Sequence, residues 1–292
     1  MKPPPFEYFV PTSVEETTTL LAEHGEEAKI LAGGQSLVPL LNFRLVQPHT
    51  LIDINRLQVL SGIKESDSGI HVGALTRHRE VENSALVKSK CPILAAAAGL
   101  IGHVAIRNRG TFGGSLAHAD PAAEFPLVLT ALEGKIFLTS SSGQRVIGAT
   151  DFFLDYLTTD VRQGEIVVGA WVPSWPARTG WGFHEFTLQH GGFAVAAVAA
   201  LGTFDREGLC TKARIALGNV ASTPVRNPAA EQILLGTRFE ADAIARAARA
   251  SVTDLEPVGG YPASAEYRIG LAEVLTRRAL EDVRLRVMQA ID

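Results

Sequence analysis

Residues 107–121 read RNRGTFGGSLAHADP, and this polar, glycine-rich stretch is the most unusual in the chain. At its centre, Thr111-Phe112-Gly113-Gly114-Ser115 places a hydroxyl group on each side of a Gly-Gly pair. Glycine lets a backbone approach a ligand closely and adopt positive φ angles. A helix is predicted just behind this turn, from about Ala122 to Leu132. The turn therefore has the features of an anion-binding loop.

A second turn of the same kind lies near the N-terminus. Ala32-Gly33-Gly34-Gln35-Ser36 follows a short apolar strand predicted over 29–32 and begins a helix predicted over about 35–44. Free N–H groups at the start of a helix, together with the helix dipole, favour an anion. Each turn alone is also consistent with a plain connection between a strand and a helix. Two of them in one domain predict a diphosphate held from two sides.

Acidic and basic side chains surround the glycine-rich stretch, and each has more than one interpretation. Asp120 and Glu124 could accept hydrogen bonds from sugar hydroxyls of a dinucleotide. Asp120 is better interpreted as the cap of a helix starting at Pro121, because proline is favoured at the first helical position. Glu124, in the first turn of that helix, fits the helix dipole as well as a sugar contact. Arg107 and Arg109 would meet a phosphate, a partner protein or only solvent.

The pattern along the chain predicts two domains of different build. Strands and helices alternate at α/β spacing up to Pro173-Ser174-Trp175-Pro176, the predicted boundary, and three β-like stretches followed by helices come after it. Ser13 and Glu16 form a capping box at the start of a helix that Gly25 ends. The predicted strands are 29–32, 50–54, 69–74, 135–139, 144–147, 165–172, 182–188, 194–204 and 211–220, and the predicted helices are 13–24, 35–44, 93–101, 122–132, 228–235, 241–252 and 264–290.

The composition excludes several classes of protein. The 292 residues are 46% hydrophobic and 20% charged, with a net charge of −4 and no basic runs, so a nucleic-acid-binding protein is not expected. The longest apolar runs, near 93–101 and 193–201, are shorter than the roughly 20 residues of a membrane helix. The first residues lack the apolar core of a signal peptide. We therefore expect a cytoplasmic protein with no membrane span.

Cysteine is scarce in the chain. Cys91 and Cys210 are the two cysteines, far apart and without a CxxC motif, which is typical of a reducing compartment. An iron–sulfur cluster needs about four cysteine ligands, so the chain cannot hold one by itself. The eight histidines show no metal-ligand spacing. The sequence also lacks GxGxxG, GxxxxGK[ST], HExxH and GxSxG motifs, and no metal ligand or catalytic side chain is predicted.

In their order and separation, the two turns resemble the paired FAD loops of the medium subunits of molybdenum hydroxylases. This is the family of xanthine dehydrogenase and aerobic carbon monoxide dehydrogenase, including bacterial enzymes of the nicotine- and caffeine-dehydrogenase type. Ala119-Asp120-Pro121-Ala122-Ala123-Glu124 is similar too, and so are Gly192-Phe193-Ala194, 213–220 and 223–226 in the C-terminal part. The resemblance extends over nearly the whole chain.

The resemblance implies an α+β fold. A two-lobed FAD-binding domain of the vanillyl-alcohol-oxidase (PCMH) type would span residues 1–176, with lobes of about 1–57 and 58–176. A three-stranded antiparallel sheet with a helical bundle would follow in residues 177–292, similar to the carbon monoxide dehydrogenase flavoprotein C-terminal domain. The cofactor-binding residues that it implies are Ala32, Gly33, Gly34, Gln35, Ser36, Leu37, Ile101, Thr111, Phe112, Gly113, Gly114, Ser115, Glu124, Val167 and His184.

Three positions depart from the family pattern. Glu124 stands where the family usually has Asp, so its carboxylate arm is one methylene longer. His184, which the residues alone would make a surface or core polar side chain, falls near a Lys that some relatives carry beside the isoalloxazine. A neutral imidazole there would stabilise reduced anionic flavin less than an ammonium group. Relatives often have Gly-Asp at Gly191-Gly192, a pair that is also consistent with a β-bulge.

The resemblance further implies an electron-transfer function. The chain would carry FAD in a heterotrimer with a large molybdenum–molybdopterin subunit that hydroxylates the substrate and a small subunit with two [2Fe–2S] clusters. Electrons from the clusters would reach FAD and then an external acceptor. A dimer of heterotrimers is one candidate assembly. The substrate is expected to be an N-heterocycle of the alkaloid or purine type, with carbon monoxide as the alternative.

Two other functions remain open at this point. A self-sufficient FAD oxidase would bind its own substrate in an apolar pocket with convergent polar groups. A non-catalytic assembly module would use the glycine turns only as chain connections, and the purified protein would then be colourless.

Overall fold

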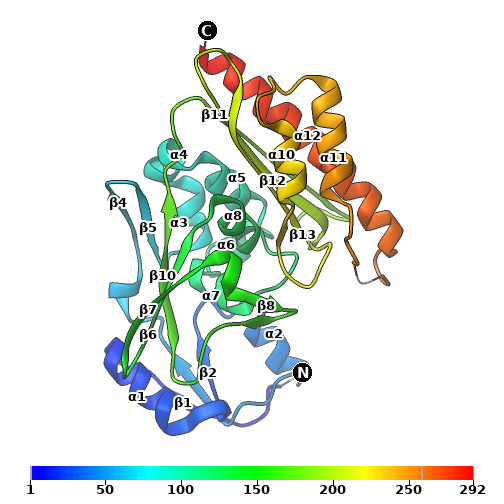
Figure 1. Cartoon of the computed structure of the whole chain (residues 1–292). Coiled ribbons are helices and arrows are strands. Elements are labelled where there is room, and N and C mark those ends of the chain that lie inside the picture. The colour runs from blue at the N-terminus through cyan, green and yellow to red at the C-terminus, as the bar shows by residue number, and fades with distance from the viewer. Residues whose placement is uncertain (1, 258, 292) are drawn as a thin grey trace.

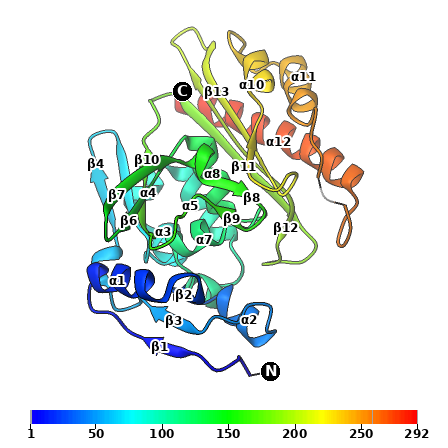
Figure 2. The ribbon, with the colours of Figure 1, turned by 60° about the horizontal axis from the view of Figure 1, so that its bottom comes forward.

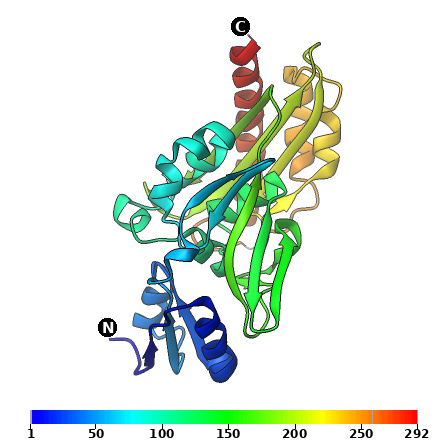
Figure 3. The ribbon, with the colours of Figure 1, turned by 90° about the vertical axis from the view of Figure 1, so that its left-hand side faces the viewer.

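The computed structural model describes residues 2–257 and 259–291, which form a small N-terminal lobe, a central body and a C-terminal sheet covered by helices (Figure 1). The N-terminal lobe has a three-stranded parallel sheet in the order β1-β3-β2, with β1 Glu7–Phe9, β2 Ala28–Leu31 and β3 Thr50–Asp53. Figure 3 shows this lobe set apart from the rest of the molecule. Its helices are α1 Val14–His24 and α2 Leu37–Asn42.

Capping interactions fix the helix α1, as the sequence predicts. The Ser13 hydroxyl accepts a hydrogen bond from the Glu16 amide, and Gly25, with a φ angle of 57°, ends the helix. The Glu16 carboxylate in turn accepts from the Thr12 amide at 2.7 Å rather than from Ser13. Leu21 of this helix packs with Ile52 of β3 in the small core of the lobe.

A five-stranded antiparallel sheet forms the central body. Its order is β4-β5-β10-β6-β7, with β4 Ile63–Ser66, β5 Gly69–Gly73, β6 Lys135–Ser140, β7 Gly143–Gly148 and β10 Ile166–Pro173. Its helices are α3 His78–Asn83, α4 Ala85–Lys90, α5 Pro92–Leu100, α6 Val104–Arg107, α7 Phe112–His118, α8 Glu124–Leu132 and α9 Ala149–Phe152. A two-stranded ribbon, β8 Phe153–Asp155 and β9 Thr158–Thr159, follows α9.

The C-terminal sheet has four strands, one more than the sequence predicts. They are β11 Thr179–Thr187, β12 Ala194–Phe204, β13 Cys210–Gly218 and β14 Val225–Arg226. The extra strand is only two residues long, too short for a sequence pattern, and pairs with Ala216 and Leu217. The helices that follow are α10 Pro228–Leu234, α11 Ala241–Ser251 and α12 Ala265–Ile291.

Strand β12 is covered on both faces. Ala197, Ala199 and Leu201 belong to the core that contains α5, α7 and α8, whereas Ala196, Val198 and Ala200 belong to the core that contains α12. Successive residues of a strand point to opposite faces, which explains a continuous apolar run in a central strand. The sheet therefore lies between the central body and the C-terminal helices (Figure 1). Within the described ranges, no helix has the length and apolarity to span a membrane.

Two local predictions need correction. Helix α7 begins at Phe112, so Gly113 and Gly114 lie in the first turn of a helix rather than in a loop. Helix α8 begins at Glu124, with Ala123 at its N-cap, so Asp120 does not cap it. Instead, the Asp120 carboxylate accepts a hydrogen bond from the Ala122 amide at 2.9 Å and stabilises a turn before the helix.

The packing of α12 on β11 generates a stability prediction. A Cβ atom at Gly182 would lie 2.1 Å from the Ala279 carbonyl oxygen, so Gly182→Ala must push the helix away from the strand. Overpacking of this kind costs about 1–3 kcal/mol, and we expect a lower melting temperature by circular dichroism. Gly270→Ala is the matched control, because a Cβ there meets nothing within 4 Å. Equal melting temperatures for both variants would contradict this packing.

Candidate functional site

The two glycine turns touch each other. A Cβ atom at Gly33 would lie 2.4 Å from the Arg109 carbonyl oxygen and 2.8 Å from Gly110 Cα. A Cβ atom at Gly114 would lie 4.0 Å from Ala32 Cβ. Carbon atoms pack at about 3.5–4.0 Å, so a side chain at residue 33 would separate the turns. Figures 1 and 2 show the same neighbourhood, with α7 next to the end of β2.

The first turn presents a run of free amides. In the described part of the chain, the N–H groups of residues 33–36 have no hydrogen-bond acceptor. Gly34 has a φ angle of 71°, a left-handed conformation that glycine adopts without strain. Consecutive N–H groups around such a residue form a concavity that attracts anions. The Gln35 side-chain amide donates to the Gly33 carbonyl at 3.1 Å, so one of its two N–H bonds is already used.

The second turn contributes hydroxyl groups rather than amides. The amide of Phe112 donates to Thr76, that of Gly113 to Ala74, and those of Gly114 and Ser115 to Thr111. These bonds start α7 and use the amides of residues 112–115, so none of these four is left for a ligand. The Thr111 hydroxyl accepts from the Gly114 amide at 3.2 Å and keeps its own proton to donate. The sequence predicts a diphosphate held from two sides; in the structure the first turn offers free amides and the second offers hydroxyl groups.

The buried His78 side chain forms a hydrogen bond with the backbone of the second turn. Its Nε2 lies 3.0 Å from the Thr111 carbonyl oxygen, so this nitrogen carries the proton and donates it. The imidazole ring packs edge-on against Phe125, with ring centroids 5.1 Å apart. Burial lowers the pKa of His78 to about 4, so the ring is neutral at neutral pH. Its role was not visible in the sequence, where 33 residues separate it from Thr111.

The apolar candidates differ in their positions and in how much of each side chain is exposed. Val167 is buried in β10 beside a bulge, and the next carbonyl, that of Val168, accepts from the Ala74 amide at 3.1 Å. Ala74 in turn accepts from Gly113, so β10 supports the second turn through one residue. Ile101 ends α5 and is 8% exposed. The Phe112 side chain is fully buried in the central core, which leaves it no surface for a ligand.

The structure separates His184 from the other candidates. Its Nε2 lies 3.2 Å from the Asp282 carboxylate of α12, on the face of β11 that packs against the C-terminal helices. Phe183 belongs to the central core on the opposite face, and alternation along the strand places Glu185 on that face too. Sequence spacing cannot choose between adjacent residues of one strand. Glu185, which the sequence analysis missed, is the residue of this pair that lies on the side of the turns.

Two carboxyl groups lie between the central body and the C-terminal sheet. Burial, together with the nearby carboxylates of Glu185 and Asp120, raises the pKa of Glu124 to about 8. Burial also raises the pKa of Glu185 to about 7. One oxygen of Glu185 is fully buried and has no hydrogen-bond partner among the described residues. A buried oxygen without a partner is costly, so this position fits a group supplied by a ligand.

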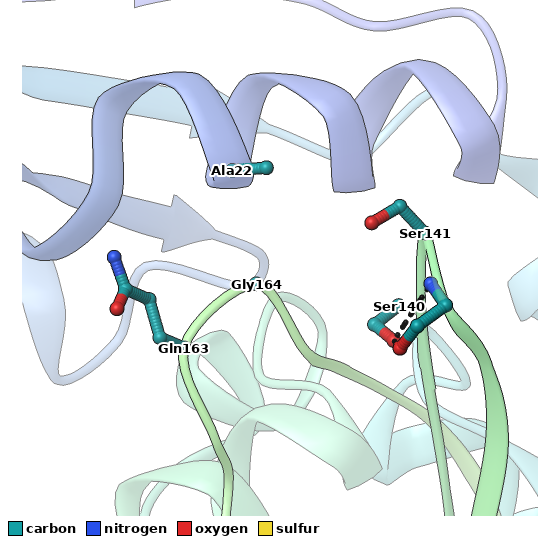
Figure 4. Close-up of a pocket in the computed structure, with 6 residues that line it drawn as sticks. Ala22, Ser140, Ser141, Gln163 and Gly164 are labelled. Atoms are coloured by element: carbon teal, nitrogen blue, oxygen red, sulfur yellow. Dashed lines mark hydrogen bonds between the residues drawn. The ribbon is translucent and has the colours of Figure 1, made fainter.

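Two cavities lie outside this interface. One, of about 460 Å³, is lined by Arg77, Arg79, Glu80, Asn83 and Asn108 and lies beside the residues that lead into the second turn. The other, of about 240 Å³, lies between α1 and the β6–β7 hairpin, where Ala22 faces Ser140 and Ser141 (Figure 4). It contains none of the predicted site residues. In residues 2–257 and 259–291, no group of three His, Cys, Asp or Glu side chains could hold a metal ion.

The carboxyl pair predicts a pH dependence of stability. A carboxyl group whose pKa rises from 4.5 to about 8 on folding keeps its proton in the folded protein and loses it in the unfolded chain. Stability is therefore highest below pH 4.5 for this group and falls as the pH rises towards 8, by at most about 1.4 kcal/mol per pH unit. We expect Glu124→Gln to flatten the decrease in melting temperature of the FAD-free chain between pH 6 and about pH 8.5. Glu27→Gln, at an exposed carboxylate, serves as control, and parallel curves for all three proteins would refute the assignment.

Family models match both parts of the chain. Residues 4–175 match the model described as the FAD binding domain in molybdopterin dehydrogenase. Residues 181–283 match the model described as the CO dehydrogenase flavoprotein C-terminal domain. The change from one model to the other falls where the central sheet ends at β10 and the C-terminal sheet begins at β11.

Similar proteins cover the chain almost completely. The 6-hydroxypseudooxynicotine dehydrogenase complex subunit alpha of Paenarthrobacter nicotinovorans is 44% identical over 280 residues, 96% of this chain and 95% of that protein. A solved structure of carbon monoxide dehydrogenase from Hydrogenophaga pseudoflava matches with a TM-score of 0.95 and 39% identity, over 98% of this chain and 99% of that one. Quinoline 2-oxidoreductase from Pseudomonas putida 86 matches with a TM-score of 0.94 and 37% identity, over 99% and 100%.

The residues present also fit the cofactor on physical grounds. A run of free amides lies on one turn and a hydroxyl donor on the turn that it contacts, and a diphosphate requires donors of this kind. The unpartnered oxygen of Glu185 leaves room for a polar group of a ligand. The chain belongs to the family of FAD-binding medium subunits of molybdopterin-dependent hydroxylases, and it is the flavoprotein subunit of a multi-subunit dehydrogenase complex.

Proposed function

We propose that the chain relays electrons between partner iron–sulfur clusters and an external acceptor. In this proposal a large subunit carries molybdenum–molybdopterin, and a small subunit carries two [2Fe–2S] clusters. The cysteine content supports the division, because Cys91 and Cys210 are both free and buried and a cluster needs about four cysteine ligands. Free cysteines also support a reducing, cytoplasmic setting. A dimer of heterotrimers is the proposed assembly.

The observation that carries this proposal is the contact between the glycine turns. We assign the FAD diphosphate to that contact, with the amides of residues 33–36 on one side and the hydroxyls of Thr111 and Ser115 on the other. Bound FAD supplies the redox chemistry, and the protein holds it in place and tunes its surroundings. Leu37, Ile101 and Val167 would contribute backbone and apolar surface.

The carboxyl pair belongs to the proposed site, and His184 does not. Glu124 and Glu185 lie between the central body and the C-terminal sheet, close enough for the charge of Glu185 to raise the pKa of Glu124. We assign Glu124 to a hydroxyl group of the cofactor, with Glu185 beside it. The hydrogen bond of His184 to Asp282 holds its ring on the other face of the sheet. The proposed domains are residues 1–176, with lobes of about 1–57 and 58–176, and residues 177–292.

We propose an N-heterocycle as the substrate of the whole complex. The likeness to a quinoline 2-oxidoreductase and to a 6-hydroxypseudooxynicotine dehydrogenase subunit supports this class. Carbon monoxide is the second candidate, because a carbon monoxide dehydrogenase shares the fold with a TM-score of 0.95. The selecting residues would lie on the large subunit, since the site proposed for this chain holds the cofactor and not the substrate.

Gly33→Ala tests the proposed cofactor site. The new methyl group would strike the Arg109 carbonyl oxygen at 2.4 Å and push the turns apart. Overpacking of about 1–3 kcal/mol corresponds to a roughly 5- to 150-fold weaker dissociation constant for FAD. The measurement is the ratio of absorbance at the flavin band to that of the protein after purification. Gly99→Ala is the matched control, because a Cβ there makes only ordinary contacts at 3.7 Å and beyond. Full flavin content in Gly33→Ala would argue against this site.

Purification of the complex tests the proposed partners. A tag on this chain should retain a large molybdopterin-containing subunit and a small iron–sulfur subunit, and quinoline should reduce the flavin in that complex more rapidly than carbon monoxide does. If the isolated chain oxidised a substrate by itself, the alternative of a self-sufficient FAD oxidase would replace the electron relay.

A further inference from the structure

Two polar side chains from different lobes connect the glycine turns. Asn55 follows β3 in the N-terminal lobe, and Arg77 precedes α3 in the central body. The Asn55 amide nitrogen donates to the Ala32 carbonyl at 2.7 Å, and its oxygen accepts from Arg77 Nη2 at 2.8 Å. Arg77 Nη1 donates to the Arg109 carbonyl. We call these three hydrogen bonds the Asn55–Arg77 bridge; it runs from the first turn to the residues that lead into the second.

The bridge ends on the Ala32 and Arg109 carbonyl groups, which lie where the two turns meet. The Arg109 carbonyl oxygen is the atom that comes closest to Gly33, so Arg77 holds the very group against which the first turn packs. The Ala32 carbonyl belongs to the same peptide plane as the Gly33 N–H. Because a trans peptide is planar, this N–H points away from the carbonyl and thus away from Asn55. Asn55 therefore sets the direction of the first free amide of the turn.

The hydrogen bonds to these two carbonyls also affect the electrostatic environment of a bound phosphate. Carbonyl oxygens carry partial negative charge and repel a phosphate, whereas N–H groups attract it. The bridge occupies both carbonyls with donors, and the Gly33 amide remains free. Without the bridge, rotation of the Ala32–Gly33 peptide would replace an attractive group with a repulsive one at the same place.

Neighbouring groups hold the bridge itself in one arrangement. The Asp53 carboxylate accepts from the Asn55 backbone amide at 2.9 Å and from its side-chain amide at 2.6 Å. Burial raises the pKa of Asp53, but hydrogen bonds from Tyr8 and Asn55 outweigh this and keep the pKa below its usual value. An ionised carboxylate only accepts, so it orients the Asn55 nitrogen towards Ala32 and the oxygen towards Arg77. The bridge is thus fixed before any ligand binds.

We propose that Asn55 and Arg77 are positioning residues for FAD: they hold the Ala32 and Arg109 carbonyls so that the joined turns present donors to the diphosphate. This inference rests on the proposed function, in which the turns bind that diphosphate. A role in fold stability alone is the competing explanation. The two explanations differ in whether FAD affinity or only the melting temperature depends on the bridge.

Variants of the full-length chain separate these explanations. The measurements are the dissociation constant of added FAD, from flavin fluorescence, and the melting temperature of the FAD-free protein. Loss of either bridge residue removes two of the three hydrogen bonds, and we expect Asn55→Ala and Arg77→Ala each to raise the dissociation constant about tenfold. The double variant should lose less affinity than the sum of the two single losses, because both single variants already remove the hydrogen bond that Asn55 and Arg77 share.

Conservative variants keep the test valid if the alanine variants fold poorly. Arg77→Lys retains the charge, but a single ammonium group cannot reproduce the planar fork that reaches Asn55 and Arg109 together, so we expect an intermediate loss of affinity. Asn55→Asp replaces the donor to Ala32 with a carboxylate and should weaken binding at least as much as alanine. Arg79→Ala is the matched control on α3, since its side chain donates to Asn108 at 3.1 Å and lies outside the bridge.

The outcomes distinguish this inference from the proposed function. If Asn55→Ala, Arg77→Ala and Arg77→Lys bind FAD as tightly as the wild type and only melt earlier, the positioning role is overturned. If Gly33→Ala loses FAD while the bridge variants keep it, only the bridge fails and the site stands. If Gly33→Ala also keeps FAD, the site itself is misplaced. Weaker FAD binding in the bridge variants at an unchanged melting temperature, with Arg79→Ala unaffected, supports the inference.

Discussion

The contact between Gly33 and the Arg109 carbonyl is the constraint on which the proposed cofactor site depends. It joins two turns that belong to different sheets, the parallel sheet of the N-terminal lobe and the antiparallel sheet of the central body. A side chain of any size at residue 33 would occupy the space where the turns meet. Glycine at this position lets the two turns come into contact. Free amides from one lobe and hydroxyls from the other therefore come within reach of one ligand group.

The C-terminal sheet borders the proposed site from the other side. Strand β12 is apolar on both faces, so it is buried against the central body on one side and against α12 on the other. This packing brings Glu185 towards Glu124, and burial gives both carboxyls pKa values close to neutral pH. Groups that titrate near neutrality beside a redox cofactor can adjust its surroundings without taking part in the chemistry. In the proposed electron relay, this kind of adjustment is what the protein would contribute.

Local signals in the sequence predicted much of this architecture. The cap at Ser13, the stop at Gly25 and the apolar run of β12 each lie within a dozen residues, and the structure contains all three. The glycine turns were found for the same reason. Short elements such as β1, β4 and β14 were missed because they are held by neighbouring strands rather than by a pattern of their own. The start of α7 within the second turn was missed because two glycines disfavour a helix, and long-range hydrogen bonds to Ala74 and Thr76, which no local pattern predicts, help to place it there.

The sequence did not predict which side chains interact across the proposed site. His184 and Glu185 are adjacent, and which of them faces the turns depends on how β11 lies between two cores. Asn55 and Arg77 are 22 residues apart, and no spacing rule connects an asparagine after a strand to an arginine before a helix. Asp120 carried a signal for a helix cap, but the chain makes a further turn before α8 begins. In each case the missing information is the three-dimensional arrangement of elements that are separately predictable.

The central claim is that two turns from different lobes hold one diphosphate between them. Diffraction from crystals of the FAD-loaded chain, or of its complex, tests this most directly by locating the two phosphorus atoms. The account predicts phosphate oxygens within hydrogen-bonding distance of the amides of residues 33–36 and of a hydroxyl of Thr111 or Ser115. A diphosphate bound elsewhere, with these amides facing solvent, would contradict it.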